Sequence, residues 1–256
     1  MENKNALIFI FVVIVLVVAI IVITSAIDTG DFSITYKGNS KKYENIIKSG
    51  INRWSSIGTG GVHITFSTYS NPGTNVIADT CGSTIRINEE KIRPSTGSLV
   101  IAHEVGHVLG IGVGWGPNDT TKSIGGVIHY LSDDKYPKTA AAFRTIRPAT
   151  ATAKALAGPP LYTTNGGGSD GSTWAHWENS QNYGMGKDIM RHTISSSHTV
   201  ISIVDLTYLE EIGRTVDVSQ AENLSSSYFN SVTSSIYGDE EIKDFCGNCS
   251  RNKNDI

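Results

Sequence analysis

The residues with the clearest chemistry are His103-Glu104-Val105-Gly106-His107, an H-E-x-x-H motif. Two histidines four residues apart project from the same face of an α-helix, so both imidazoles can bind one metal ion. The glutamate lies beside them without being needed as a ligand, which suits a general base that takes a proton from water. The alternative is a helix that carries two ordinary polar histidines. The motif predicts zinc bound by His103 and His107, with Glu104 as the catalytic base.

A third ligand is needed, because a catalytic zinc ion has three protein ligands and an open position for water. A glutamate on the next helix is not expected, since no glutamate occurs between Glu104 and Glu178. Gly110 instead extends the motif to H-E-x-x-H-x-x-G, in which the glycine allows a sharp turn under the metal. The compact form of this longer motif has its third histidine where this chain has Val113. The histidines further along the chain are His129, His176, His192 and His198.

The segments that follow the motif resemble those of leishmanolysin-like peptidases, which belong to the metzincin clan. In that family the third histidine comes after a long insertion and a glycine-rich stretch, and a Met-turn and a closing helix follow it. The segments that carry the resemblance are residues 158–161 and 166–172, His176-Trp177-Glu178, Asp188-Ile189-Met190 and residues 203–213. The resemblance covers roughly residues 96–217.

The resemblance implies a zinc-dependent endopeptidase that hydrolyses peptide bonds with a metal-activated water. His176 would be the third ligand of one Zn²⁺ ion, and Glu104 would accept the proton of the water. Gly110 and Met190 would support the site, the methionine as a hydrophobic floor beneath the metal. His192 stands two residues after Met190, where some metzincins have a tyrosine that assists the tetrahedral intermediate, so it is a candidate transition-state helper.

Two features depart from the family. Thr173-Trp174-Ala175 lengthens the approach to His176, and the family's cysteine-rich pattern and pro-segment are absent. Latency by a cysteine switch is therefore not expected, and Cys81 is interpreted as structural. Three cysteines are too few for a disulfide scaffold and leave the compartment open. Cys246 and Cys249 could form a local disulfide or half a metal site, or be two ordinary thiols.

Apolar periodicity predicts the elements that must position these residues. Strands are expected at residues 32–37, 62–69, 75–79 and 83–88, and helices from Asn39-Ser40 to Trp54 and at residues 96–109, 138–146 and 201–212. The expected fold is α+β: a metzincin-like catalytic domain with an N-terminal twisted mixed sheet plus two helices, and a mainly irregular and helical C-terminal subdomain. One transmembrane helix would precede it.

Four regions are expected along the chain. Residues 1–27 form a membrane anchor, residues 28–112 the N-terminal catalytic subdomain, residues 113–217 the C-terminal catalytic subdomain, and residues 218–256 a tail. Residues 6–23 are apolar without a charge, and as a helix they would span roughly 27 Å, close to a bilayer's hydrocarbon core. A cleaved signal peptide is the alternative, because Thr24-Ser25-Ala26 resembles a cleavage site.

The catalytic domain is expected outside the cytoplasm, or secreted if the N-terminal segment is cleaved, although the lysines flanking residues 6–23 do not favour an exported C-terminus. A net charge of −3 gives no broad basic surface, so nucleic acid is not an expected partner. Protein or peptide substrates are expected, and an extended substrate would pair with an edge strand within residues 75–88.

Two alternative functions are considered. One is a catalytically silent zinc-binding surface protein, acting in adhesion or partner binding, and the other is a zinc-dependent hydrolase of another bond.

Overall fold

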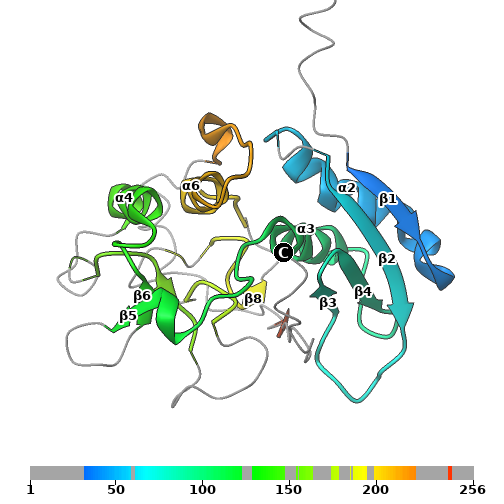
Figure 1. Cartoon of the computed structure of the whole chain (residues 1–256). Coiled ribbons are helices and arrows are strands. Elements are labelled where there is room, and N and C mark those ends of the chain that lie inside the picture. The colour runs from blue at the N-terminus through cyan, green and yellow to red at the C-terminus, as the bar shows by residue number, and fades with distance from the viewer. Residues whose placement is uncertain are drawn as a thin grey trace, which may run out of the picture.

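The computed structural model describes a mixed sheet with two helices, followed by a C-terminal part with two further helices and short strands (Figure 1). The described residues are 32–58, 61–122, 129–147, 154, 156–163, 174–178, 185, 187–194, 199–222 and 242–243. Within these ranges the chain is α+β with four α-helices, so that part of the predicted fold class is confirmed.

The N-terminal sheet has the strand order β1-β2-β4-β3. Its strands are β1 (Ser33–Tyr36), β2 (His63–Tyr69), β3 (Ala78–Cys81) and β4 (Thr84–Asn88). The first three strands in this order run parallel, whereas β3 pairs antiparallel with β4 and forms an edge. Alternate residues of the central strands are buried, for example Ile85 and Ile87 of β4, because successive side chains of a strand point to opposite faces.

Two helices pack against this sheet, α2 (Glu44–Ser55) and α3 (Gly97–Leu109). The indole nitrogen of Trp54 donates to the carbonyl oxygen of Ala102 at 2.7 Å and joins them. The helix expected from Asn39-Ser40 begins later, because a 3-10 helix, η1 (Gly38–Tyr43), precedes α2. The Ser40 hydroxyl donates to the carbonyl oxygen of Phe66 at 2.9 Å instead of capping a helix.

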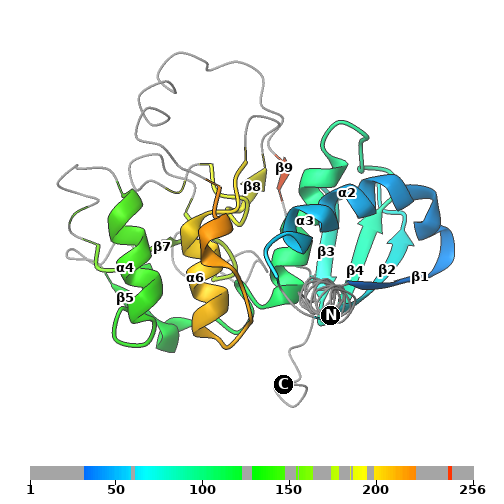
Figure 2. The ribbon, with the colours of Figure 1, turned by 90° about the horizontal axis from the view of Figure 1, so that it is seen from above.

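In the C-terminal part, α4 (Pro137–Ile146) lies beside α6 (Ile203–Glu211), on the far side of α3 from the mixed sheet (Figure 2). Glu211 joins these helices, since its carboxylate accepts the backbone N–H groups of Lys138 and Thr139 at 2.9 and 3.0 Å. A carboxylate at a helix N-terminus satisfies free N–H groups and suits the helix dipole. The elements of this part are η2 (Pro117–Asp119), β5 (Thr120–Lys122), β6 (His129–Leu131), α4 (Pro137–Ile146), β7 (Pro160–Leu161), β8 (Thr193–Ile194), α6 (Ile203–Glu211), η4 (Val218–Gln220) and β9 (Ile242–Lys243).

The predicted elements agree with the structure to within a few residues, with one informative shift. The strand expected at residues 75–79 lies at Ala78–Cys81, because its hydrogen-bonded partner β4 fixes the register. Among the described residues no helix has the length and apolar character needed to cross a membrane. The apolar segment at residues 6–23 and most of the tail lie outside the described ranges.

Candidate metal centre

Helix α3 presents His103 and His107 one turn apart, and each ring is oriented by its second nitrogen. Nδ1 of His103 lies 2.6 Å from the carbonyl oxygen of Ile189, and Nδ1 of His107 lies 2.8 Å from that of Ile111. A carbonyl oxygen can only accept, so Nδ1 carries the hydrogen in both rings. Nε2 therefore offers a lone pair, which is the arrangement of histidines that bind metals.

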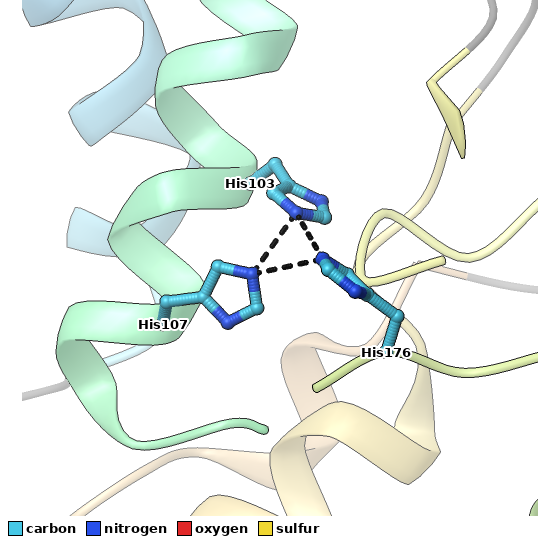
Figure 3. Close-up of side chains that lie close together, drawn as sticks. All are labelled: His103, His107 and His176. Carbon is cyan, nitrogen blue, oxygen red and sulfur yellow. Dashed lines mark hydrogen bonds between the residues drawn. The ribbon is translucent and has the colours of Figure 1, made fainter. Parts of the chain in front are cut away.

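The third histidine of the site is His176, which lies 69 residues after His107. The three Nε2 atoms are 3.1 Å from one another, and all three rings are buried (Figure 3). Among the residues the structure describes, these three form the one group of His, Cys, Asp or Glu side chains close enough to hold a metal ion.

The spacing of these nitrogens fits a metal ion. Nitrogens about 2.0–2.1 Å from a tetrahedral zinc ion would be about 3.3 Å apart, close to the distance observed. The lone pairs of His103 and His107 also face each other in a buried space, which is unfavourable unless a cation lies between them. Their geometry therefore supports binding of a metal ion, and its identity as zinc stays a prediction.

His129, the other histidine weighed as third ligand, lies apart from this group. Its ring packs edge-on against Trp174, with the ring centroids 4.6 Å apart, and its Nδ1 lies 3.5 Å from the Thr120 hydroxyl. It is not a member of the metal-binding group. The structure thus favours His176 over His129, whereas His198 lies outside the described residues.

Two glycine-dependent turns bring His176 to α3. Gly110 ends the helix with φ +120°, as the extended motif predicts, and Gly112 follows with φ +75°. A Cβ atom on Gly112 would stand 1.9 Å from the carbonyl oxygen of Ala175, the residue before His176. The loop after α3 can thus lie directly against the segment that carries the third histidine. The sequence pattern identified Gly110, but Gly112 was one of several glycines with no assigned role.

Met190 packs against α3 in the middle of the H-E-x-x-H motif, and its role as a floor beneath the metal stays a prediction. It is fully buried, and its sulfur would be 2.2 Å from a Cβ atom on Gly106, inside the H-E-x-x-H motif. The absence of a side chain at Gly106 therefore makes room for the methionine. A glycine inside a helix lowers stability by about 1 kcal/mol relative to alanine. A glycine in the middle of a predicted helix is therefore the sequence feature that could have identified Gly106.

Glu104 is buried on the same helix and is held towards the edge strand β3. The hydroxyl of Thr80 donates to its Oε2 at 2.5 Å. Thr80 had no assigned role, because a threonine in a strand is ordinary and the contact joins residues 24 positions apart. Cys81, the next residue of β3, is disulfide-bonded.

Two buried carboxyl groups fasten the turn at Met190 to α6. Asp188 accepts the backbone N–H of Met190 at 2.7 Å, while Asp205 accepts from the indole nitrogen of Trp177 at 2.8 Å and forms a capping box with Ser202. Burial and then the neighbouring charge of Asp205 raise the pKa of Asp188 well above its ordinary value. Burial raises the pKa of Asp205 to about 6. A proton on Asp188 lets the two carboxyl groups hydrogen-bond instead of repelling.

His192 contacts Tyr162, which in turn hydrogen-bonds the backbone of the third histidine. The His192 and Tyr162 rings stack with centroids 3.6 Å apart, and the Tyr162 backbone N–H donates to the His176 carbonyl oxygen at 2.9 Å. This contact fixes the ring of His192 near the site, and its catalytic role stays a prediction.

No protein-family model matches the chain, and no curated protein or solved structure shows significant similarity to it.

We expect Gly112→Ala to lower zinc affinity and thermal stability more than Gly114→Ala. Both glycines have positive φ, +75° and +80°, so both substitutions carry a backbone strain of about 1–2 kcal/mol. Only at Gly112 would the new methyl group collide with Ala175 and displace His176, since a Cβ atom on Gly114 would meet nothing within 4 Å. Zinc titration and thermal unfolding of both variants measure the difference, and equal losses would contradict this role of Gly112.

We compare the free energy of unfolding of zinc-free Asp188→Asn with that of the zinc-free natural chain. The difference in favour of Asp188→Asn should grow as the pH rises from 5 to 8. The pKa values of Asp188 and Asp205 are higher in the folded chain than in the unfolded chain. Protons on this pair therefore stabilise the natural chain fully below about pH 4, and this stabilisation is lost as the pH rises through the folded-state pKa values. An amide mimics the protonated carboxyl and stays uncharged, which avoids a loss on the order of 1 kcal/mol. Thermal unfolding across this pH range measures it, with Asp188→Ala as the destabilised control. A constant difference between Asp188→Asn and the natural chain would rule out a retained proton.

Proposed function

We propose that the chain is a zinc-dependent endopeptidase of the metzincin type, similar to leishmanolysin-like enzymes. One observation carries the proposal: three buried Nε2 atoms converge within 3.1 Å, and Glu104 lies on the helix that supplies two of them. The turn at Gly110, expected from the extended motif, and the packing of Met190 against that helix, expected from the resemblance, support the metzincin assignment.

The proposed reaction is hydrolysis without a covalent enzyme intermediate. A zinc ion held by the three histidines would lower the pKa of water towards 7 and polarise the scissile carbonyl. Glu104 accepts the proton of the attacking water and delivers it to the leaving amine. Thr80 holds the Glu104 carboxylate by its hydroxyl, which keeps this base oriented towards β3. His192, fixed against Tyr162, is our candidate for stabilising the tetrahedral intermediate.

The substrate proposed for this site is an extended polypeptide. Strand β3 pairs with β4 on one side only, among the described residues, and its other edge has backbone groups that can pair with a peptide. Thr80 belongs to this strand and contacts Glu104, so a peptide paired with β3 would pass beside the proposed base. This supports protein or peptide substrates, and the catalytic domain would comprise residues 28–217.

We further propose that residues 6–23 anchor the chain in a membrane and that the catalytic domain lies outside the cytoplasm. The disulfide at Cys81 supports this orientation, because disulfides persist in oxidising compartments and are rare in the cytosol. The lysines around the apolar segment do not favour this orientation, so the disulfide is the observation that supports it. Cleavage of the segment would give a secreted enzyme instead.

The experiment for this function uses Glu104→Gln in the full-length chain, purified in mild detergent. We expect cleavage of an unfolded protein to fall by about 10²–10⁴-fold, because a glutamine cannot accept the proton of the water. Zinc content should be unchanged, since the proposed ligands are intact. Cleavage by the natural chain should stop when a chelator removes the metal. Proteolysis that persists in Glu104→Gln would refute the proposed mechanism.

Matched histidine variants test the ligands in the same preparation. His176→Ala should lose zinc and activity together, whereas His129→Ala should keep both, because His129 packs against Trp174 away from the group. A natural chain that binds zinc and cleaves no protein would favour the silent surface protein. Hydrolysis of small esters or amides alone would favour the hydrolase of another bond.

A further inference from the structure

The pairing of β3 with β4 determines which backbone groups of this edge strand are open. The backbone N–H of Asn88 donates to the carbonyl oxygen of Ile77 at 2.8 Å, and the register of the two strands, continued by one residue, places these residues opposite each other. Hydrogen-bonded pairs alternate with non-hydrogen-bonded pairs in an antiparallel ladder. Asp79 is therefore bonded to β4, whereas Ala78 and Thr80 direct their N–H and C=O groups to the other edge of β3.

Thr80 is the residue of β3 at which this edge can be reached. Ala78 is fully buried, so the backbone groups that it directs to the edge are covered. Cys81, like Asp79, belongs to a pair that is bonded to β4. Thr80 is only partly buried, and it thus offers the one N–H donor and the one C=O acceptor of β3 that an incoming peptide can use. A single pairing residue fixes the register of the peptide, because a shifted peptide finds no second position.

The side chain of Thr80 points to α3 and holds the proposed base. Ile85, opposite Thr80 in the ladder, is fully buried, so this face of the two strands packs against the helices. The Thr80 hydroxyl donates to Oε2 of Glu104 at 2.5 Å and lies 3.2 Å from the carbonyl oxygen of the same residue. Two contacts from one hydroxyl fix Glu104 relative to the edge at which a peptide would pair.

We propose that Thr80 couples the substrate to the base. Its backbone N–H and C=O exchange hydrogen bonds with the peptide, while its hydroxyl acts through Glu104 by keeping the carboxylate in place. The proposal rests on the proposed peptidase function. Because one residue holds both partners, pairing places a particular peptide bond next to the base and the metal. Thr80 thereby sets which bond of an extended chain is attacked.

Thr80→Val in the full-length, zinc-loaded chain tests the hydroxyl, with casein as the unfolded substrate. Valine keeps the shape of threonine but cannot donate to the carboxylate. We expect kcat to fall by about 10–100-fold, the effect of losing a hydrogen bond to a charged group, while KM and zinc content change little. Thr80→Ser keeps the hydroxyl and should recover most of the lost kcat. Thr84→Val, in the same hairpin on the other face from Ile85, is the matched control and should keep the kcat of the natural chain.

A second measurement separates positioning from a loss of structure. Thr80→Val is combined with Glu104→Gln, and the residual rate of casein cleavage is measured. If the hydroxyl acts through the Glu104 carboxylate, Thr80→Val should barely change this residual rate, because the effects of residues that act as a unit are not additive. A loss by the same factor in both backgrounds would overturn the role of the hydroxyl. Equal losses of kcat in Thr80→Val and Thr80→Ser would overturn it too.

Thr80→Pro tests the backbone pairing. Proline and valine both lack the hydroxyl, but only proline lacks the N–H at the open edge. This N–H is directed away from β4, so its loss leaves the ladder intact, and proline is tolerated at such edge positions. We expect the KM for casein to be several-fold higher in Thr80→Pro than in Thr80→Val. Equal KM values in the two variants would overturn the pairing.

These measurements distinguish a failure of this proposal from a failure of the peptidase function. Cleavage by the natural chain without the expected effects at Thr80 would refute the proposal alone. If the natural chain cleaves no casein, the peptidase is refuted, and with it the role of the hydroxyl. Binding of casein to the zinc-loaded chain then tests the pairing, and it should be several-fold weaker in Thr80→Pro than in Thr80→Val, whereas equal binding would overturn the pairing as well. Thr80→Ala, which also lacks the hydroxyl, replaces Thr80→Val in every comparison if Thr80→Val does not fold.

Discussion

Three imidazole nitrogens held 3.1 Å apart in a buried space are the constraint on which much of the remaining structure depends. Such a group is suited to bind a metal ion, and a second hydrogen bond orients the rings of His103 and His107. Helix α3 supplies two rings, yet the carbonyl oxygen that orients His103 belongs to Ile189, the residue before Met190. The helix and the turn at Met190 therefore depend on each other, although 86 positions separate His103 from Ile189.

The C-terminal part stabilises this arrangement by fixing the segment of His176 on several sides. Gly112 lets the loop after α3 lie against Ala175, Trp177 hydrogen-bonds Asp205 at the start of α6, and Asp188 holds Met190. Each contact uses a buried polar group or a missing side chain. Beside the site, Thr80 of the edge strand β3 orients the proposed base.

The sequence predicted the helix of the first two histidines, its end at Gly110 and most of the sheet, because these follow from local periodicity and from a motif with fixed spacing. His176 required the resemblance to a family, since spacing alone left several histidines open. Thr80 and the carboxyl pair of Asp188 and Asp205 could not be found in this way. Their contacts join residues far apart in the chain, and they depend on strand register and on the packing of the Met-turn under α3. The start of β3 was misplaced for the same reason, because pairing with β4 fixes it.

The central claim is that one zinc ion binds to His103, His107 and His176, and the most direct measurement is zinc K-edge X-ray absorption of the full-length protein with one equivalent of zinc. We expect a first shell of nitrogen and oxygen at about 2.0–2.1 Å, with the multiple scattering of three imidazoles. A first shell that contains sulfur at about 2.3 Å, or the scattering of only two imidazoles, would contradict the account.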